Sequence, residues 1–258
     1  HPLPVSFTNA STNAAINSWT FGDGASSALV NPTHIYQNSG TAPVNYTATL
    51  TVQTLEGCQN DTSISITVNH KPTAQILPVS AAGCEPLSIN FTNSSIAGTS
   101  FLWDFDDGST ATTTNVAAHS YPNNTNDTLF FNPTLYVGTT QGCFDTAFAN
   151  VQVYLKVNAS FGVPQAGCSP FVAQFTDQSL NANSYNWSFG DGNSSILSNP
   201  SHLYVNNGAA PQNLNVNLTV QSVEGCQSDT TVPVTINHKP NAQISPATFT
   251  GCQPLLVN

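Results

Sequence analysis

The sequence predicts an all-β protein built from two-sheet antiparallel sandwiches in tandem. Three observations predict it. The polar residues are mostly Asn, Thr, Ser and Gln, which favour strands and turns. Short runs alternate apolar and polar residues, and no ten-residue stretch has the spacing of an amphipathic helix. The chain also repeats itself about every 84 residues.

The charge composition excludes several classes of function. The 258 residues include 3 Lys plus Arg and 13 Asp plus Glu, so the net charge is −10. Charged residues make up 6% of the chain, where about 25% is usual. These cations are too few to neutralise nucleic-acid phosphates or to form a polybasic membrane-binding surface. No segment approaches the roughly 18 consecutive apolar residues of a spanning helix, so we expect no membrane insertion here.

Three tryptophans mark the repeat. Trp19, Trp103 and Trp187 recur at intervals of 84 residues, and we expect each to lie in the core of one module. Their motifs are S-W-T-F-G-D-G, L-W-D-F-D-D-G and N-W-S-F-G-D-G, followed downstream by N-P-T-H-I-Y, a shortened H-S-Y and N-P-S-H-L-Y. Residues 50–76 and 218–244 are identical at 18 of 27 positions, which indicates that a two-module unit was duplicated.

Local patterns place the strands and turns of a module. Residues 46–53 alternate as a half-buried strand, and residues 63–68 alternate likewise after a turn at 56–58, which predicts a hairpin. Gly22-Asp23-Gly24 is a tight-turn signal. About seven short strands are expected per module. In the second module, the loop over residues 110–132 is expected to be irregular.

The repeat gives the expected domain boundaries. Residues 1–70 form a first module without its first strand, 71–156 a divergent second module, 157–239 a third, and 240–258 the start of a fourth. His1-Pro2-Leu3 aligns with tripeptides that follow a Gly-Cys pair in the later modules. We therefore expect a window from a longer array.

The series W-x-F-G-D-G, N-P-x-H-x-Y and L-T-V…G-C-x-x-D-T resembles PKD (polycystic kidney disease) domains over essentially the whole chain. The resemblance implies immunoglobulin-like sandwiches, an extracellular location and a spacer, adhesion or filament role without catalysis. The cysteine-bearing form resembles repeats of large Bacteroidota surface proteins, which are exported by the type IX system and include gliding-motility adhesins. The implied partners are neighbouring PKD modules, surface glycans or a substratum. The alternative is a spacer or carbohydrate-binding accessory region of a secreted polysaccharide- or protein-degrading enzyme.

Six cysteines without a C-x-x-C pair favour disulfides in an oxidising setting over a zinc site. In the implied topology, Cys58, Cys143 and Cys226 lie at one end of their modules, and Cys84, Cys168 and Cys252 lie at the other. A sandwich of about 25–30 Å separates the ends, and a bridge needs Cα atoms within roughly 7 Å.

Head-to-tail stacking of the modules would therefore pair Cys84 with Cys226 across a junction. Cys143 would pair with a cysteine preceding His1, and Cys58, Cys168 and Cys252 with modules outside this chain. Pairing within modules (Cys84–Cys143, Cys168–Cys226) and between sequence neighbours (Cys58–Cys84, Cys143–Cys168) remains open, because connectivity cannot be deduced from sequence.

No catalytic constellation is present in the sequence, so we expect no enzyme activity from these residues. Asp104, Asp106 and Asp107 are the one candidate calcium site, but an Asp-Gly turn explains them equally and the distal Glu of an EF-hand is missing. No other cofactor is expected. His34, His119 and His202 recur once per module and cannot converge on one metal, which favours packing or hydrogen bonding inside each sandwich. His70 and His238 are expected to make contacts at module borders.

Overall fold

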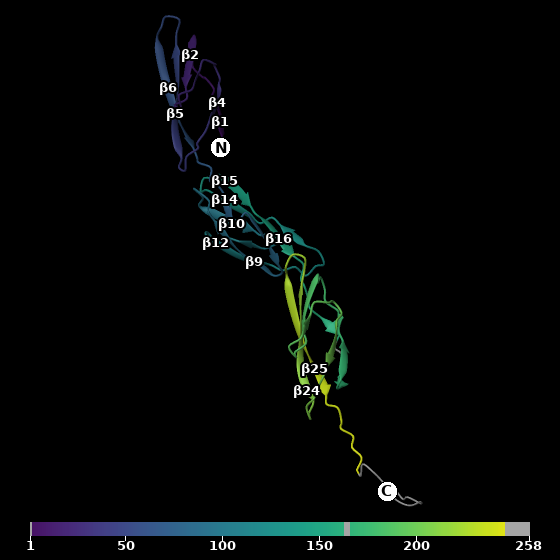
Figure 1. Cartoon of the computed structure of the whole chain (residues 1–258). Coiled ribbons are helices and arrows are strands. Elements are labelled where there is room, and N and C mark those ends of the chain that lie inside the picture. Colours follow the sequence, from purple (N-terminus) through teal and green to yellow (C-terminus); the bar gives the residue numbers. More distant parts are fainter. Residues whose placement is uncertain (1, 163–165, 246–258) are drawn as a thin grey trace, which may run out of the picture. The chain divides into compact units, whose positions relative to one another are not determined.

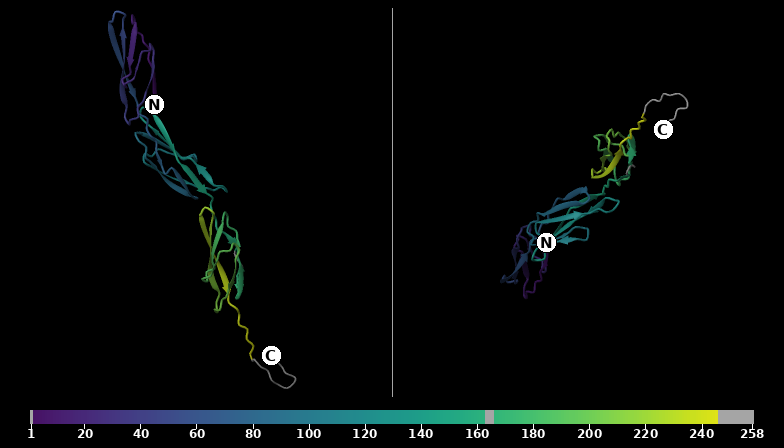
Figure 2. Two further views of the ribbon diagram at one scale, coloured as in Figure 1. Left: turned by 45° about the horizontal axis from the view of Figure 1, so that its top comes forward. Right: turned by 90° about the horizontal axis from the view of Figure 1, so that it is seen from below.

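The computed structural model describes residues 2–162 and 166–245, and all regular structure there is β-strand (Figure 1 and Figure 2). The chain divides into two compact units, His1–Tyr154 and Leu155–Asn258. The first unit contains two sandwiches and the second contains one. The predicted all-β fold of tandem antiparallel sandwiches is confirmed.

The first sandwich pairs a four-stranded sheet, in the order β3-β2-β5-β6, with a two-stranded sheet, β1-β4. Its strands are β1 (Leu3–Ser6), β2 (Ile16–Thr20), β3 (Ser26–Ser27), β4 (Thr33–Tyr36), β5 (Val44–Gln53) and β6 (Gln59–Val68). The predicted hairpin is confirmed as β5 and β6, which pair from Val44↔Val68 to Gln53↔Gln59 and are longer than predicted.

The second sandwich has sheets β11-β10-β14-β15, β12-β9-β7 and β13-β16-β8. Strand β8 runs parallel to β16 over five residue pairs, whereas the other pairs are antiparallel. The strands are β7 (Ile76–Leu77), β8 (Ser80–Cys84), β9 (Leu87–Asn93), β10 (Ser100–Asp104), β11 (Thr110–Ala111), β12 (Val116–Tyr121), β13 (Leu129–Phe131), β14 (Thr134–Gly138), β15 (Phe144–Phe148) and β16 (Asn150–Tyr154).

The third sandwich, in the second unit, has sheets β18-β25-β24-β21-β22, β19-β23 and β17-β20. Its long hairpin β24–β25 stands out in Figure 1. The strands are β17 (Phe161–Gly162), β18 (Gly167–Cys168), β19 (Phe171–Gln174), β20 (Thr176–Asp177), β21 (Ser184–Ser188), β22 (Ser194–Ser195), β23 (Ser201–Tyr204), β24 (Gln212–Gln221) and β25 (Gln227–Asn237).

Each sandwich closes around its own tryptophan, as predicted. Trp103 and Trp187 are fully buried and Trp19 is 5% exposed. In the second sandwich Trp103 packs with Phe91, and in the third Trp187 packs with Phe175. The cores form because alternate residues of each strand point inward, as in β9, where Ile89 and Phe91 are buried and their neighbours are exposed.

The loop expected to be irregular in the second sandwich is largely regular. Residues 110–132 contain β11, β12 and β13, so that prediction was wrong. The segment keeps the inward-facing Tyr121 of the shortened H-S-Y motif, and this residue is enough to hold β12 against β9. The divergence lies elsewhere: the counterpart of β5 is broken into β13 and β14 at Asn132-Pro133.

The first glycine of the F-G-D-G turn is required for two reasons. Gly22 has φ of +82°, a region that side chains disfavour, and a Cβ there would lie 2.6 Å from the Thr47 carbonyl oxygen. Asp106 occupies this position in the second sandwich with φ of +63°. Its carboxylate accepts a hydrogen bond from the Asn132 amide at the strand break, so the break accommodates the side chain.

We expect Gly22→Ala to destabilise the first sandwich more than Gly24→Ala. Gly24 also has a positive φ, of +94°, but nothing lies within 4 Å of an added Cβ. The control substitution should therefore cost only backbone strain, about 1–2 kcal/mol, whereas Gly22→Ala adds an overpacking cost of about 1–3 kcal/mol. Urea titration with hydrogen exchange read on peptides of β2 and β5 measures both. Equal losses of protection would contradict the packing argument.

Candidate functional site

The most conserved geometry among the three sandwiches is an Asp–His pair beside the turn after the tryptophan strand. His34 Nε2 lies 2.6 Å from Asp23 Oδ2, and the same pair recurs as His119–Asp107 at 2.6 Å and His202–Asp191 at 2.7 Å. Each histidine comes from the strand opposite the turn: β4, β12 or β23. The predicted role of these histidines, packing and hydrogen bonding within a sandwich, is confirmed.

Aromatic rings surround each pair. The His34 ring stacks on Phe21 at 4.1 Å between centroids and meets Tyr36 edge-on. The buried Tyr36 hydroxyl donates a hydrogen bond to the Phe21 carbonyl at 3.1 Å. Tyr121 and Tyr204 donate equivalent bonds to Phe105 and Phe189. Each bond ties the turn of one sheet to a strand of the other sheet.

The aspartates of these pairs are held in the charged form. Partial burial by itself raises the pKa of Asp23, but the hydrogen bonds from His34 and the Ala25 amide outweigh it, so the pKa lies below its ordinary value. The same balance lowers the pKa of Asp107 and Asp191. Burial raises the pKa of Tyr36, so its hydroxyl remains a donor.

The three carboxylates of the candidate calcium loop point to separate partners. Asp104 accepts a bond from the Asp106 amide, Asp106 accepts one from the Asn132 amide, and Asp107 bonds Ser109 and His119. Over residues 2–162 and 166–245, no three His, Cys, Asp or Glu side chains converge where they could hold a metal ion. The geometry favours the Asp-Gly turn over a calcium site.

The cysteines differ in state. Cys84, at the end of β8, and Cys226, just before β25, are disulfide-bonded. Cys58, Cys143 and Cys168 are free thiols. Both bonds of the intramodule pairing need one of these free thiols, Cys143 or Cys168. Cys252 lies outside the described residues.

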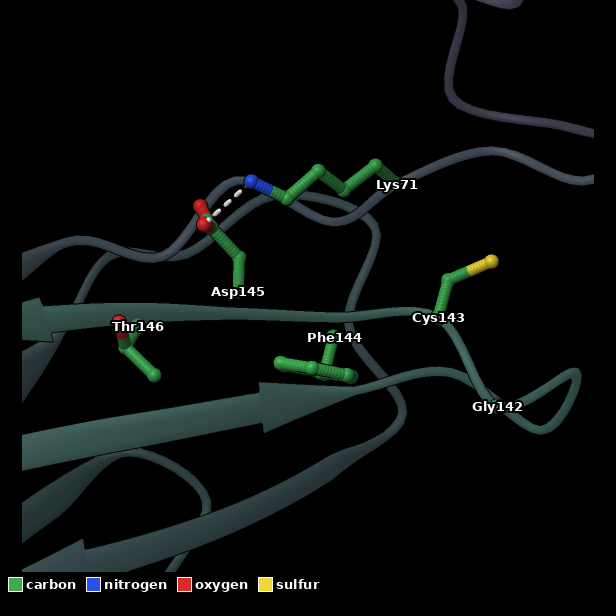
Figure 3. Close-up of a pocket in the computed structure, with 6 residues that line it drawn as sticks. All are labelled: Lys71, Gly142, Cys143, Phe144, Asp145 and Thr146. Atoms are coloured by element: carbon green, nitrogen blue, oxygen red, sulfur yellow. Dashed lines mark hydrogen bonds and ion pairs between the residues drawn. The ribbon is translucent and has the colours of Figure 1, made fainter. Parts of the chain in front are cut away.

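A surface pocket of about 390 Å³ lies at the turn before β15 (Figure 3). Lys71 Nζ lies 2.6 Å from Asp145 Oδ1, and the Ala74 amide donates to the other carboxylate oxygen. Partial burial opposes ionisation of Asp145, but the bonds from Lys71 and Ala74 prevail and its pKa is lowered. The Cys143 sulfur points away from this pair (Figure 3). The pocket therefore holds a structural ion pair that fastens residue 71 to β15.

The border histidines differ from one another. His70 Nε2 lies 3.2 Å from the Ala97 carbonyl oxygen and the residue is 9% exposed, as expected for a border contact. His238 is exposed.

Sequence reasoning missed the Asp–His pairing and the buried asparagines Asn38, Asn123 and Asn206. Each of these amides donates to the carbonyl near the end of the last strand, as Asn38 does to Val68 at 2.8 Å. A usable signal was present: Asp and His recur 11 or 12 residues apart in all three copies.

The Asp–His pairs predict a loss of stability in acid. Because the pKa of Asp191 is lower in the folded than in the unfolded chain, its contribution is fully present above the unfolded pKa of about 4 and is lost as pH falls through the folded pKa. Asp191→Asn should flatten the fall of the melting temperature below about pH 4. Glu224→Gln, on the exposed turn of the same sandwich, is the control and should keep the wild-type slope. Identical slopes for all three proteins would contradict the assignment.

Comparison with known proteins places this geometry in a family. The PKD domain model matches residues 2–68 and 160–236. The PKD1 domain of the Vibrio cholerae metalloprotease PrtV is 22% identical and covers 32% of this chain and 99% of its own, with a TM-score of 0.28. The PKD1 domain of Vibrio anguillarum Epp is 24% identical and covers 33% and 98%, with a TM-score of 0.28. Drosophila N-cadherin EC1-4 is 11% identical and covers 93% and 70%, with a TM-score of 0.39.

Comparison with curated proteins finds no match. Within the part of the chain that the structure describes, no helix is long and apolar enough to cross a membrane. The family assignment comes from the sequence match, which spans more than half of the chain and includes the Trp, Asp–His and Tyr positions of the first and third sandwiches. The chain therefore belongs to the PKD domain family.

Proposed function

We propose that these modules are a non-catalytic structural repeat of a long extracellular adhesin or surface filament, in which they act as a stiff spacer. PKD domains are generally non-catalytic modules and are typical of extracellular proteins. The observation that carries the proposal is the threefold repetition of one complete stabilising set, in which Trp, Phe, Asp–His and Tyr recur with nearly the same distances. Residues kept in every copy in this way serve the fold of each module.

Composition supports the same role. Uniform negative charge keeps neighbouring rods apart, and the few Lys and Arg residues offer few sites to trypsin-like proteases. The wider assignment, to a Bacteroidota-type adhesin that is exported by the type IX system and serves adhesion or gliding, is supported by the repeated G-C-x-P-L and G-C-x-x-D-T motifs. In that role the modules sit at the cell surface, with surface glycans or a substratum as partners.

Module boundaries after residues 70, 156 and 239 are part of this proposal. They fall where β6, β16 and β25 have ended, at Val68, Tyr154 and Asn237. Such short connections suit a spacer, because they leave little chain to bend.

The proposal includes a disulfide between Cys84 and Cys226. Both residues are disulfide-bonded, whereas Cys58, Cys143 and Cys168 are free. A bond at this position would limit rotation where the second module meets the third, which is the property a stiff spacer needs.

Electron microscopy of the native full-length protein, on the cell surface and after shearing, tests the filament. We expect threads with a repeat of roughly 35–45 Å per module, from strand length plus a junction. A compact particle with a short stalk would contradict the filament. That result would support the alternative, an accessory region of a secreted polysaccharide- or protein-degrading enzyme.

Peptide mapping without reduction tests the pairing. We expect one cross-linked peptide that contains Cys84 and Cys226, and its loss in Cys84→Ser. Cys58→Ser is the matched control and should leave the cross-link unchanged, because Cys58 is an exposed free thiol. Cross-links of Cys84 to Cys143 or of Cys168 to Cys226 would overturn the scheme.

A further inference from the structure

The first sandwich carries an open apolar groove that its two counterparts lack. The groove has a volume of about 520 Å³ and is lined by Val5, Phe7, Trp19, Leu50, Ile64 and Ile66, among others. It lies beside β1 and β6, each of which is an edge strand of its sheet. Two open edges on either side of an apolar floor are a site for an added strand.

In the second sandwich, the chain itself covers the equivalent edges. Strand β7 pairs with β9, and β8 pairs with β16. Ile76 of β7 is 3% exposed and belongs to the core.

The third sandwich is covered in the same way. Strand β17 pairs with β20, and β18 pairs with β25. Phe161 of β17 packs against Trp187 at 5.0 Å between ring centroids. In the first sandwich, no strand among the described residues pairs with the open edge of β1 or β6.

The core beneath the groove is less completely buried as a result. Phe7 and Ile66 are each 9% exposed, whereas their counterparts Phe91 and Val151 are 0% and 1% exposed. Trp19 Nε1 is buried without a hydrogen-bond partner. The indoles of Trp103 and Trp187 instead donate to main-chain carbonyls.

The chain also contains a matching strand segment that covers nothing in the described residues. Residues 239–245, Lys-Pro-Asn-Ala-Gln-Ile-Ser, repeat residues 71–77, Lys-Pro-Thr-Ala-Gln-Ile-Leu. Ile244 is the counterpart of the buried Ile76 but is 83% exposed, and Lys239 is exposed.

The anchors of residues 71–77 have a counterpart on the first sandwich. In the second sandwich Asp145 receives both the Lys71 ammonium and the Ala74 amide. The corresponding residue of the first sandwich is Asp61, which is exposed on β6 next to the groove. One segment could therefore place a lysine and an amide on Asp61 and an isoleucine in the groove.

We propose that the segment beginning at Lys239 of a second copy of this chain docks along the groove of the first sandwich as an added strand. Lys239 and the Ala242 amide bind Asp61, and Ile244 enters the groove in the register that Ile76 has in the second sandwich. The contact joins two different surfaces, so successive copies form an open head-to-tail series. The inference rests on the proposed function, because it supplies the way in which copies of the repeat join in line.

Sedimentation velocity on residues 1–258 over a range of concentrations tests the docking. We expect concentration-dependent dimers and longer species. Ile244→Asp should weaken the association at least tenfold, whereas Leu55→Asp, at an 87% exposed position outside the groove, should leave it unchanged. A wild-type chain that stays monomeric, or association that survives in Ile244→Asp, overturns the proposal.

A charge exchange tests the register. Asp61→Lys alone should weaken association by repulsion from Lys239, and the double variant Asp61→Lys, Lys239→Asp should restore it. A double variant no better than the single one overturns the register. Hydrogen exchange gives a second readout: assembly should protect peptides of β6 in the wild type and not in Ile244→Asp. These outcomes are independent of electron microscopy on the native protein, so the docking can fail while the filament stands.

Discussion

The bond from a buried tyrosine hydroxyl to a phenylalanine carbonyl is the contact on which each sandwich depends. Tyr36, Tyr121 and Tyr204 are essentially unexposed, and each reaches across the core from one sheet to the turn of the other. The bond satisfies a carbonyl that would otherwise be buried without a partner, and it places the turn next to the histidine. The stacked histidine then positions its aspartate, so the turn geometry follows from a residue in the opposite sheet.

The period of the chain made the fold predictable. Tryptophans 84 residues apart and the alternation in residues 46–53 were sufficient for tandem sandwiches and for the β5–β6 hairpin. The Asp–His pairs were not predicted, because their two members lie in different sheets and their spacing has no meaning until the sheets face each other. The buried asparagines were missed for the same reason: Asn38 bonds a carbonyl 30 residues away.

The second sandwich shows how the fold tolerates a departure from its own pattern. Asp106 replaces a glycine whose Cβ would meet main chain in the first and third sandwiches. The paired strand is broken at Asn132-Pro133, and the new carboxylate bonds the amide exposed there. Reading Asp104, Asp106 and Asp107 as a group suggested a cation site, but in the structure each carboxylate satisfies a different main-chain group. Local sequence alone could not separate the two, because both uses need an acidic residue beside a glycine.

The parallel pairing of first and last strands governs how a module bears tension. A pull applied to the two ends of a module draws β8 and β16 along each other in opposite directions, so their hydrogen bonds are sheared together and must break almost at once. Five residue pairs share the load in the second sandwich, two share it in the third, and the edge of β6 offers none among the described residues. The three sandwiches therefore form a graded mechanical series, in which the first yields at low force and protects the others by extending before they do.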